Sequence, residues 1–418
     1  MAVLVDVDLN PHGVRAVLNG TERTTPEGGA GAAKIELWQS AVARNTWPTK
    51  RDSSVGALQG YGVFKDQTKS VNNPHASTES PNVVTFKSGE ALMMDFLREL
   101  PEQIFRDILL RVPYICHSKI KQLLEPAKEM LESFQFYQDR IKFGLTKKYI
   151  CFLEDHISIS IYDPTDRSRK LLPPTNAIVH KIINVNHKIV VLGQSRHLTP
   201  LFLIYDFLPS IWKHGAEFPT PRPANLEFAC CASPDGSIYI AGGNDNGLNE
   251  LRDAAVYKVD EDKWELLPKM HQGMYSCRGV FIEGMFYVID INRCQRFDPT
   301  TRAWTTINMS IPNSCLDVMY AFQRLIAFTS KGIEQYDWEG NLWRQLETLP
   351  QHHPVLNVCA TVSCDRILFC GIFRNPDIYI CKLYMYKPGA PFSERWISVD
   401  QPNSFLEGMV QSIATIEI

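Results

Sequence analysis

The segment "YKVDEDKW", Tyr257 to Trp264, holds the pattern that decides the fold of this 418-residue chain. Tyr257 ends an apolar run, an acidic turn follows, and Trp264 stands seven places after the tyrosine. An acidic turn reverses the chain, because an Asp side chain can cap the local backbone. The tryptophan then opens the next strand, where its large ring can fill the wedge between neighbouring sheets. The segment therefore predicts two strands joined by a tight turn.

The same pattern recurs through the last two thirds of the chain. Copies with both aromatic positions begin at Tyr205, Phe297 and Tyr336. A degenerate first copy begins at Tyr162 with Arg169 in the tryptophan position, and a stretched last copy runs from Tyr386 to Trp396. The copies start 43, 52, 40, 39 and 50 residues apart. Repeats of this length, with four short strands each, predict a mainly β chain folded as a β-propeller.

The tryptophans of the repeats have two interpretations. They can form an aromatic binding surface, or they can pack in the core between blades. Their fixed place after each turn favours the core. The residues predicted to pack the blades in this way are Trp212, Trp264, Trp304, Trp343 and Trp396.

Two glycines join this blade-packing set. The clearest strand before an aromatic position reads "GSIYIAGGNDNG", Gly236 to Gly247, and contains the pair Gly242-Gly243. Adjacent glycines permit positive φ and a close approach of another backbone segment at a strand end.

The ends of the repeat region predict how the ring closes. The first copy begins at "YICFLED", Tyr149 to Asp155, without the inner strand that later copies show. The chain ends with "GMVQSIATIEI", Gly408 to Ile418, a strand with no copy after it. We expect this last strand to complete the first blade of a six-bladed ring, because the sheet edges would otherwise stay unpaired.

The series of glycines, aromatic residues and tryptophans resembles the kelch repeat. The resemblance covers Tyr149 to Ile418, although only one copy keeps both glycines. It implies a kelch-type propeller over residues 145–418, closed by the C-terminal strand.

A single leucine-rich segment, "LPEQIFRDILLRVP", precedes the strands at Leu100 to Pro113. Pro101 suits the first turn of a helix, and Pro113 ends it. The apolar residues that fall on one helical face are Ile104, Ile108, Leu109 and Val112. One interpretation is a small helical cap that packs on the propeller.

The same segment resembles an F-box, the helical module that binds the Skp-type adaptor of a cullin-RING ubiquitin ligase. The resemblance extends to Phe136-Tyr137 and implies a module over residues 93–140. The residues that it implies for adaptor binding are Leu100, Pro101, Ile104, Ile108, Leu109, Val112 and Pro113.

The chain departs from the F-box pattern in the second helix. Leu124 to Ala127 stand where the family has a Cys-Arg-x-Trp signature. Loss of the tryptophan removes a core anchor, and we expect Pro126 to break a helix interior at a cost of about 3 kcal/mol.

The combination resembles plant F-box/kelch proteins that recruit phenylalanine ammonia-lyase or type-B cytokinin response regulators for degradation. The segments that carry this likeness include "FACCASPDGSIYIAGGNDN", Phe228 to Asn246, and the C-terminal strand. The resemblance implies a non-catalytic substrate-recognition subunit of an SCF-type ligase. The F-box would hold the adaptor and cullin, and the propeller would hold the target, with phenylpropanoid regulation as one implied context.

Composition limits the other function classes. The formal net charge of -3, without a dense Lys/Arg cluster, argues against nucleic-acid binding, and no apolar run reaches membrane-spanning length. Eleven cysteines without a CxxC pair indicate free thiols in a reducing compartment. We expect a soluble protein of the cytoplasm or nucleus. Residues 1–92 mix Gly, Pro, Asn, Ser and Thr without a sustained period, and we expect them to be disordered.

An enzymatic site needs a constellation of reactive side chains. His352-His353 lies in a proline-flanked loop, where adjacent histidines point in different directions and rarely share a metal. The acidic loop Gly242 to Asp253 is better explained as a solvated loop than as a metal site. We therefore predict no catalytic residue, metal or cofactor. The alternative is a kelch scaffold or small-molecule enzyme without a ligase role, in which the leading helices only cap the propeller.

Overall fold

The computed structural model describes residues 4–10, 13–19, 100–195, 199–219, 228–245, 247, 249–349, 355–375, 378–399 and 410–418. The chain divides into two compact units, residues 1–130 and 131–418.

The described part of the first unit contains a pair of strands and two complete helices. Strands β1 (Leu4–Asn10) and β2 (Gly13–Asn19) pair antiparallel. They lie within the region predicted to be disordered, and the rest of that region, up to residue 92, lies outside the described residues. The helices are α3 (Glu102–Arg111) and α4 (Tyr114–Leu123), and α5 (Glu125–Glu132) begins in this unit.

Prolines set the ends of the first two helices. Pro101 is the N-cap of α3 and Pro113 is the N-cap of α4. Val112, between the helices, has extended backbone with φ of -74° and ψ of 128°. A residue before proline avoids the helical region, because the proline ring clashes with it there. The predicted end of the first helix at Pro113 is therefore confirmed.

Pro126 corrects a prediction. It lies in the first turn of the separate helix α5, so it does not interrupt a helix interior. A first-turn proline lacks only an N–H group that would have no helical partner, and its fixed φ suits the helix. Leu124 and Ala127 are buried on either side of it. The expected penalty for a broken helix is therefore wrong.

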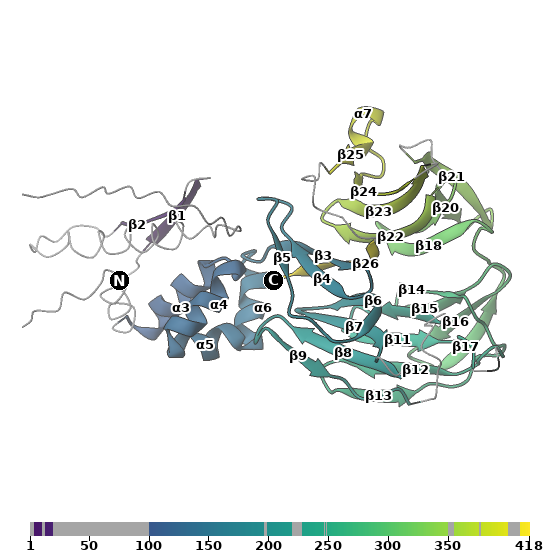
Figure 1. The fold of residues 1–418 in the computed structure, drawn as a ribbon, viewed down its shortest axis with the longest axis horizontal. Coiled ribbons are helices and arrows are strands. Elements are labelled where there is room, and N and C mark those ends of the chain that lie inside the picture. The colour runs from purple at the N-terminus through teal and green to yellow at the C-terminus, as the bar shows by residue number, and fades with distance from the viewer. Residues whose placement is uncertain are drawn as a thin grey trace, which may run out of the picture. The chain divides into compact units, whose positions relative to one another are not determined.

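The second unit is a six-bladed β-propeller preceded by α6 (Phe134–Lys142), which confirms the predicted fold class (Figure 1). Each blade is a four-stranded antiparallel sheet. The first blade contains β26 (Val410–Glu417), β3 (Lys148–Glu154), β4 (Ser158–Tyr162) and β5 (Arg169–Leu171). The second contains β6 (Ile178–Val185), β7 (Lys188–Gln194), β8 (Pro200–Asp206) and β9 (Ile211–His214). The third contains β10 (Ala229–Ala232), β11 (Ser237–Ala241), β12 (Ala254–Lys258) and β13 (Lys263–Leu266).

The other three blades follow the same order from the inner to the outer strand. The fourth contains β14 (Arg278–Ile282), β15 (Met285–Ile289), β16 (Cys294–Asp298) and β17 (Ala303–Ile307). The fifth contains β18 (Cys315–Ala321), β19 (Arg324–Thr329), β20 (Gly332–Asp337) and β21 (Leu342–Thr348). The sixth contains β22 (Val355–Ser363), β23 (Arg366–Asn375), β24 (Ile378–Tyr386) and β25 (Trp396–Ser398), with the short helix α7 (Phe392–Arg395) before its outer strand.

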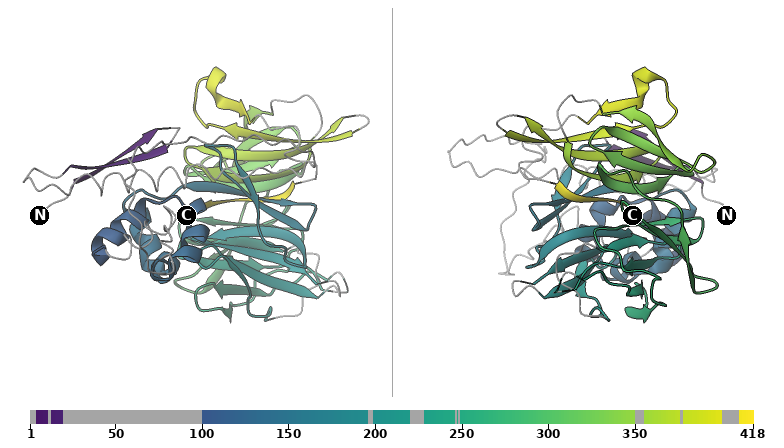
Figure 2. Two further views of the ribbon diagram at one scale, coloured as in Figure 1. Left: turned by 60° about the vertical axis from the view of Figure 1, so that its left-hand side comes forward. Right: turned by 90° about the vertical axis from the view of Figure 1, so that its right-hand side faces the viewer.

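The C-terminal strand supplies the inner strand of the first blade. β26 pairs antiparallel with β3, with Ile413 opposite Phe152. Lys147 and Ile418 extend the pairing with two reciprocal backbone hydrogen bonds of 2.8 and 3.0 Å. In Figures 1 and 2 this yellow strand lies beside the blue strands of the first blade. The ring thus closes with strands from both ends of the repeat region, so no blade is left with an unpaired inner strand.

The repeated tryptophans occupy one equivalent position on the outer strands. In the third blade Trp264 lies opposite Tyr257 and donates its indole N–H to the carbonyl of Ala216, at 2.9 Å, in the connection from the preceding blade. The same bond joins Trp212 to Pro173, Trp304 to Pro268 and Trp343 to Ser310, at 2.7 to 2.8 Å. Trp264 also packs against the apolar cluster between the second and third blades.

The first copy replaces this arrangement with an ion pair. Arg169 lies opposite Tyr162, in the register position of the tryptophans. Its guanidinium contacts the carboxylate of buried Glu154 at 2.5 Å. The degenerate copy therefore keeps the register of the repeat while changing its chemistry.

Both glycines of the pair have backbone that favours glycine. Gly242 has φ of 71° and Gly243 has φ of 94°. A Cβ atom at Gly242 would lie 2.4 Å from the carbonyl oxygen of Met274. The N–H of Gly243 donates to the same oxygen at 2.8 Å. The close approach joins this loop to the connection between the third and fourth blades.

Candidate protein-interaction surfaces

The helices of the first unit divide the predicted adaptor residues into buried and exposed sets. Leu109 and Val112 are buried, whereas Ile104 is 38% exposed. Ile108 and Leu100 are half-buried, and the capping residues Pro101 and Pro113 are exposed. Leu109 and Val112 are therefore core residues of this unit, and Ile104 is available to a partner.

Two apolar residues on α4 are also exposed. Ile115 is 50% exposed and Leu123 is also exposed. The buried residues His117, Ile120 and Leu124 follow helical spacing, and Ile115 and Leu123 fall outside that stripe. The sequence prediction did not include Ile115 and Leu123. Apolar residues that fall outside the buried stripe of a helix are the signal that could have identified them. We call Ile104, Ile115 and Leu123 the helical surface.

The propeller has two distinguishable ends. All six inner strands begin at the end that carries the connections between blades, which we call the connection face. A cavity of about 370 Å³ is lined by residues near the starts of these strands, including Lys181, Leu316 and Gln411. A second cavity, of about 640 Å³, involves later positions of the strands and is also lined by Tyr137 and Ile141 of α6. Residues of α6 therefore contribute to the lining of the channel toward the end opposite the connection face.

Three charged side chains from different blades meet at the first cavity. Lys181 and Asp317 line it, and the guanidinium of Arg278 donates to the carbonyl of Leu316, another lining residue, at 3.3 Å. The ammonium group of Lys181 lies 3.4 Å from the carbonyl oxygen of Cys230. Neither cation forms an ion pair within the described part of the chain.

Two effects change the pKa of the Asp317 carboxyl in opposite directions. Burial raises its pKa, and the positive charges of Lys181 and Arg278 partly offset that rise. One of its oxygens accepts the backbone N–H of Val318 at 2.9 Å. The sequence prediction missed these three residues, yet a charged residue inside an inner strand rich in Ile and Val, as in "IVHKIINV" at 178–185, was a readable signal.

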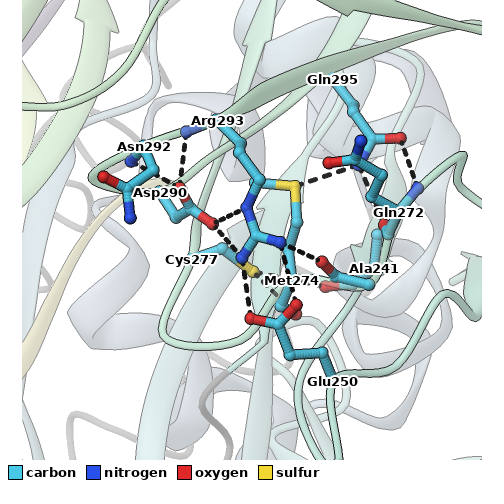
Figure 3. A network of polar contacts seen from close by, with 10 residues as sticks. Ala241, Glu250, Gln272, Met274, Cys277, Asp290, Asn292, Arg293 and Gln295 are labelled. Atoms are coloured by element: carbon cyan, nitrogen blue, oxygen red, sulfur yellow. Dashed lines mark hydrogen bonds and ion pairs between the residues drawn. The ribbon is translucent and has the colours of Figure 1, made fainter.

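A polar network holds the loops of the third and fourth blades together on the connection face (Figure 3). Arg293 contacts Asp290 at 2.8 Å and both carboxylate oxygens of Glu250 at 2.7 and 2.9 Å. It also donates to the carbonyl of Gly273 at 2.9 Å. Buried Gln295 donates to the carbonyl of Gln272 at 3.0 Å. One arginine and one glutamine thus fix two loops and the connection between two blades.

The candidate metal sites do not gain support from the described residues. In the loop Gly242 to Asp253, Asp245 accepts hydrogen bonds from its own loop, Glu250 pairs with Arg293, and Asp253 pairs with Lys269 at 3.2 Å. No group of three or more His, Cys, Asp or Glu side chains suited to a metal occurs in the described ranges. His352-His353 lies outside them.

The described part of the chain also contains no helix long and apolar enough to cross a membrane.

Comparison with known proteins agrees with this architecture. The Kelch motif family matches residues 227–271, which contain the whole third blade, Gly242, Gly243 and Trp264. The F-box/kelch-repeat protein SKIP20 of Arabidopsis thaliana is 25% identical over 286 residues, covering 53% of this chain and 68% of that protein. The chain is similar to plant F-box/kelch-repeat proteins.

Two further relatives of this F-box/kelch-repeat group, also from Arabidopsis thaliana, differ in coverage. The F-box/kelch-repeat protein SKIP30 is 22% identical over 313 residues, covering 68% of this chain and 85% of that protein. The F-box/kelch-repeat protein At1g80440 is 28% identical over 224 residues, covering 47% of this chain and 62% of that protein. The predicted likeness to plant F-box/kelch-repeat proteins is confirmed.

Proposed function

We propose that this protein is the non-catalytic substrate-recognition subunit of an SCF-type cullin-RING ubiquitin ligase. The helices around Leu100 to Pro113 bind the Skp-type adaptor, and through it the cullin. The propeller binds a target protein for ubiquitination and degradation by the proteasome. The observation that carries the proposal is the helical surface, three exposed aliphatic side chains on a helical unit, in a chain whose curated relatives are F-box/kelch-repeat proteins.

Adaptor binding through this surface has a simple energetic basis. Burying an exposed Ile or Leu side chain removes apolar area from water and stabilises a complex by about 1.5 to 3 kcal/mol when burial is complete. Leu109 and Val112 are already buried, so they would add little to the apolar area that the complex removes from water. A charge at an exposed position would be desolvated without a partner in the complex, which costs several kcal/mol.

The test is co-purification of the full chain with a Skp-type adaptor and cullin. We expect the wild type to retain both partners and Ile104→Asp and Ile115→Asp to lose them. Ile211→Asp is the matched control, because Ile211 is exposed to a similar extent but lies on the outer strand β9 of the propeller. Ile108→Asp is the less clean variant, since Ile108 is half-buried, and its melting temperature must be checked first.

Two outcomes would contradict the proposal. In one, all of these variants retain the adaptor, and in the other, not even the wild type does. Failure of the wild type to bind would favour the alternative, a kelch scaffold or small-molecule enzyme whose helices serve only as a cap. Such a result would also turn attention to Leu124 to Ala127, where the chain departs from the F-box signature.

Target and location belong to the same proposal. By resemblance, the target is phenylalanine ammonia-lyase or a type-B response regulator, and the protein acts in the cytoplasm or nucleus. Coexpression with either target should shorten the target's half-life in a proteasome-dependent way, and the Ile104→Asp variant should not. A target whose half-life is unchanged by coexpression with the wild type would be excluded as a substrate.

A further inference from the structure

The connection face combines exposed apolar side chains with cations that form no ion pair among the described residues. We propose that this face binds an acidic, extended segment of the target, with a bulky apolar side chain on Tyr275 and Ile291 and a carboxylate at Lys181 and Arg278. The inference rests on the proposed receptor function and specifies the chemistry of the target.

The apolar part of the surface lies on the fourth blade. Tyr275 is 48% exposed in the connection that leads into β14, and Ile291 is 51% exposed in the turn after β15. The start of β14 pairs with the end of β15, with Arg278 opposite Ile289. The two exposed side chains therefore flank the strand end that carries Arg278. Tyrosine and arginine are among the residues enriched in interface hot spots.

Hydrogen bonds and ion pairs hold the backbone next to these two side chains in place. Arg293 ties the turn that contains Ile291 to the carbonyl of Gly273, two residues before Tyr275, and to Glu250 of the third blade (Figure 3). Asp290 is buried and its carboxylate accepts the backbone N–H groups of Asn292 and Arg293 at 2.7 Å. A surface held in this way loses little conformational entropy when a partner binds.

The charges at the two ends of this surface determine how the bound segment is oriented. Lys181, Arg278 and Asp317 sum to one positive charge at the cavity when the Asp317 carboxylate is ionised. Arg293, Glu250 and Asp290 sum to one negative charge beneath the turn of Ile291. A carboxylate of the partner is therefore attracted at the cavity and repelled at the turn. The acidic group should point into the channel, and the apolar group should rest on the fourth blade.

The size of the cavity favours a chain segment over a folded surface. Its volume of about 370 Å³ lies at the small end of the range for ligand pockets. A few side chains fill such a space, so a protein partner must reach it with a loop or a terminus. The second cavity, toward the opposite end of the channel, is lined in part by Tyr137 and Ile141, and the proposed segment occupies the first cavity.

The experiment selects linear peptides from a random display library on the purified full-length chain. Selected peptides are then measured by fluorescence anisotropy. We expect enrichment of sequences with an acidic residue close to Phe, Leu or Ile. Lys181→Glu and Arg278→Glu should each weaken binding by about tenfold or more, and peptides with Lys in place of the acidic residue should regain affinity for Lys181→Glu.

One control and two further variants keep the result decisive. Lys213→Glu, an exposed lysine on the outer strand β9, should leave affinity unchanged. Tyr275→Ala and Ile291→Ala should weaken binding without changing the preference for an acid. If Arg278→Glu melts early, the test rests on Lys181→Glu, because the Lys181 side chain is exposed in the channel.

Enrichment of peptides without acids, absence of any enriched peptide, or full binding to the charge-reversed variants would overturn the proposal. None of these outcomes affects adaptor co-purification, which depends on the helical surface. Failure of the peptide-binding inference is therefore distinguishable from failure of the receptor function.

Discussion

Trp304 lies directly opposite Phe297 in the pairing of β16 with β17, and its indole N–H donates to Pro268 in the connection from the third blade, at 2.7 Å. The ring is buried in the apolar cluster between the third and fourth blades. One side chain thus links the outer strand of one blade to the chain entering that blade. The relationship gives the tryptophan repeat a structural reason that is independent of any ligand.

Truncation of this side chain should therefore destabilise the propeller. We expect Trp304→Ala to lower the free energy of unfolding by about 3 to 5 kcal/mol, because it removes a large buried ring and leaves a cavity. Chemical denaturation monitored by circular dichroism measures the loss. Trp338→Ala is the control, since Trp338 is 48% exposed, and it should change stability much less. Equal effects of the two substitutions would argue against the blade-packing role.

The glycine pair offers a second stability test. Gly242→Ala would place a Cβ atom 2.4 Å from the carbonyl oxygen of Met274, at a residue whose φ is 71°. Gly284→Ala is the matched control, because Gly284 also has positive φ, at 84°, but has no atom within 4 Å of the added Cβ. Positive φ alone costs an alanine about 1 to 2 kcal/mol. We expect the control to lose about that much and Gly242→Ala to lose clearly more in the same denaturation experiment.

Similar melting of both glycine variants would mean that the backbone at Met274 moves without cost. In that case the contact would not restrain the loop after β11, and its rigidity would depend on Arg293 and its partners.

The propeller could be predicted because its defining residues repeat. Tyr257 and Trp264 alone fix a turn and a register, and five further copies fix the number of blades. The helix break at Pro113 was equally local. The predicted helix break at Pro126 was wrong because the sequence did not show that a new helix begins at Glu125. A proline in the first turn of a helix looks the same in sequence as a proline in a helix interior.

The connection face could not be predicted as a surface. Lys181, Arg278 and Asp317 belong to three blades, so their proximity depends on ring closure and on the register of separate sheets. Sequence shows each as a charge in an apolar strand, which marks it as unusual but supplies no partner. The division of the F-box-like residues into buried Leu109 and exposed Ile104 likewise required the packing of the helices.

Thiol reactivity should follow burial. Cys364 is exposed, whereas burial raises the pKa of Cys294 to about 12 and that of Cys277 to about 11. The thiolate is the reactive species, so these buried thiols should react slowly. Brief treatment of the folded protein with iodoacetamide, followed by peptide mass spectrometry, should modify Cys364 well before Cys277 and Cys294. Equal labelling of the three would indicate frequent opening of the blades, and Cys364→Ser should remove the fast phase.

His187 should make stability depend on pH. The ring is 4% exposed and lies against Phe134 and Tyr137 of α6, with centroid distances of 5.3 and 5.0 Å. Burial lowers its pKa from 6.5 to about 4, although the carboxylate of Asp206, 3.6 Å away, opposes that shift. The charges of Lys188 and Asp260 act on it in opposite directions.

Proton linkage determines whether stability rises or falls with pH. Below pH 6.5 the unfolded chain binds a proton at His187 that the folded protein does not bind until about pH 4. Stability should therefore fall as pH drops through this window, by at most about 1.4 kcal/mol per pH unit for one proton. Denaturation series at several pH values measure this slope. His187→Gln should flatten it, whereas His271→Gln, at an exposed histidine, should not. An unchanged slope in His187→Gln would mean that this ring binds its proton equally well in the folded and unfolded chain, which would contradict the prediction.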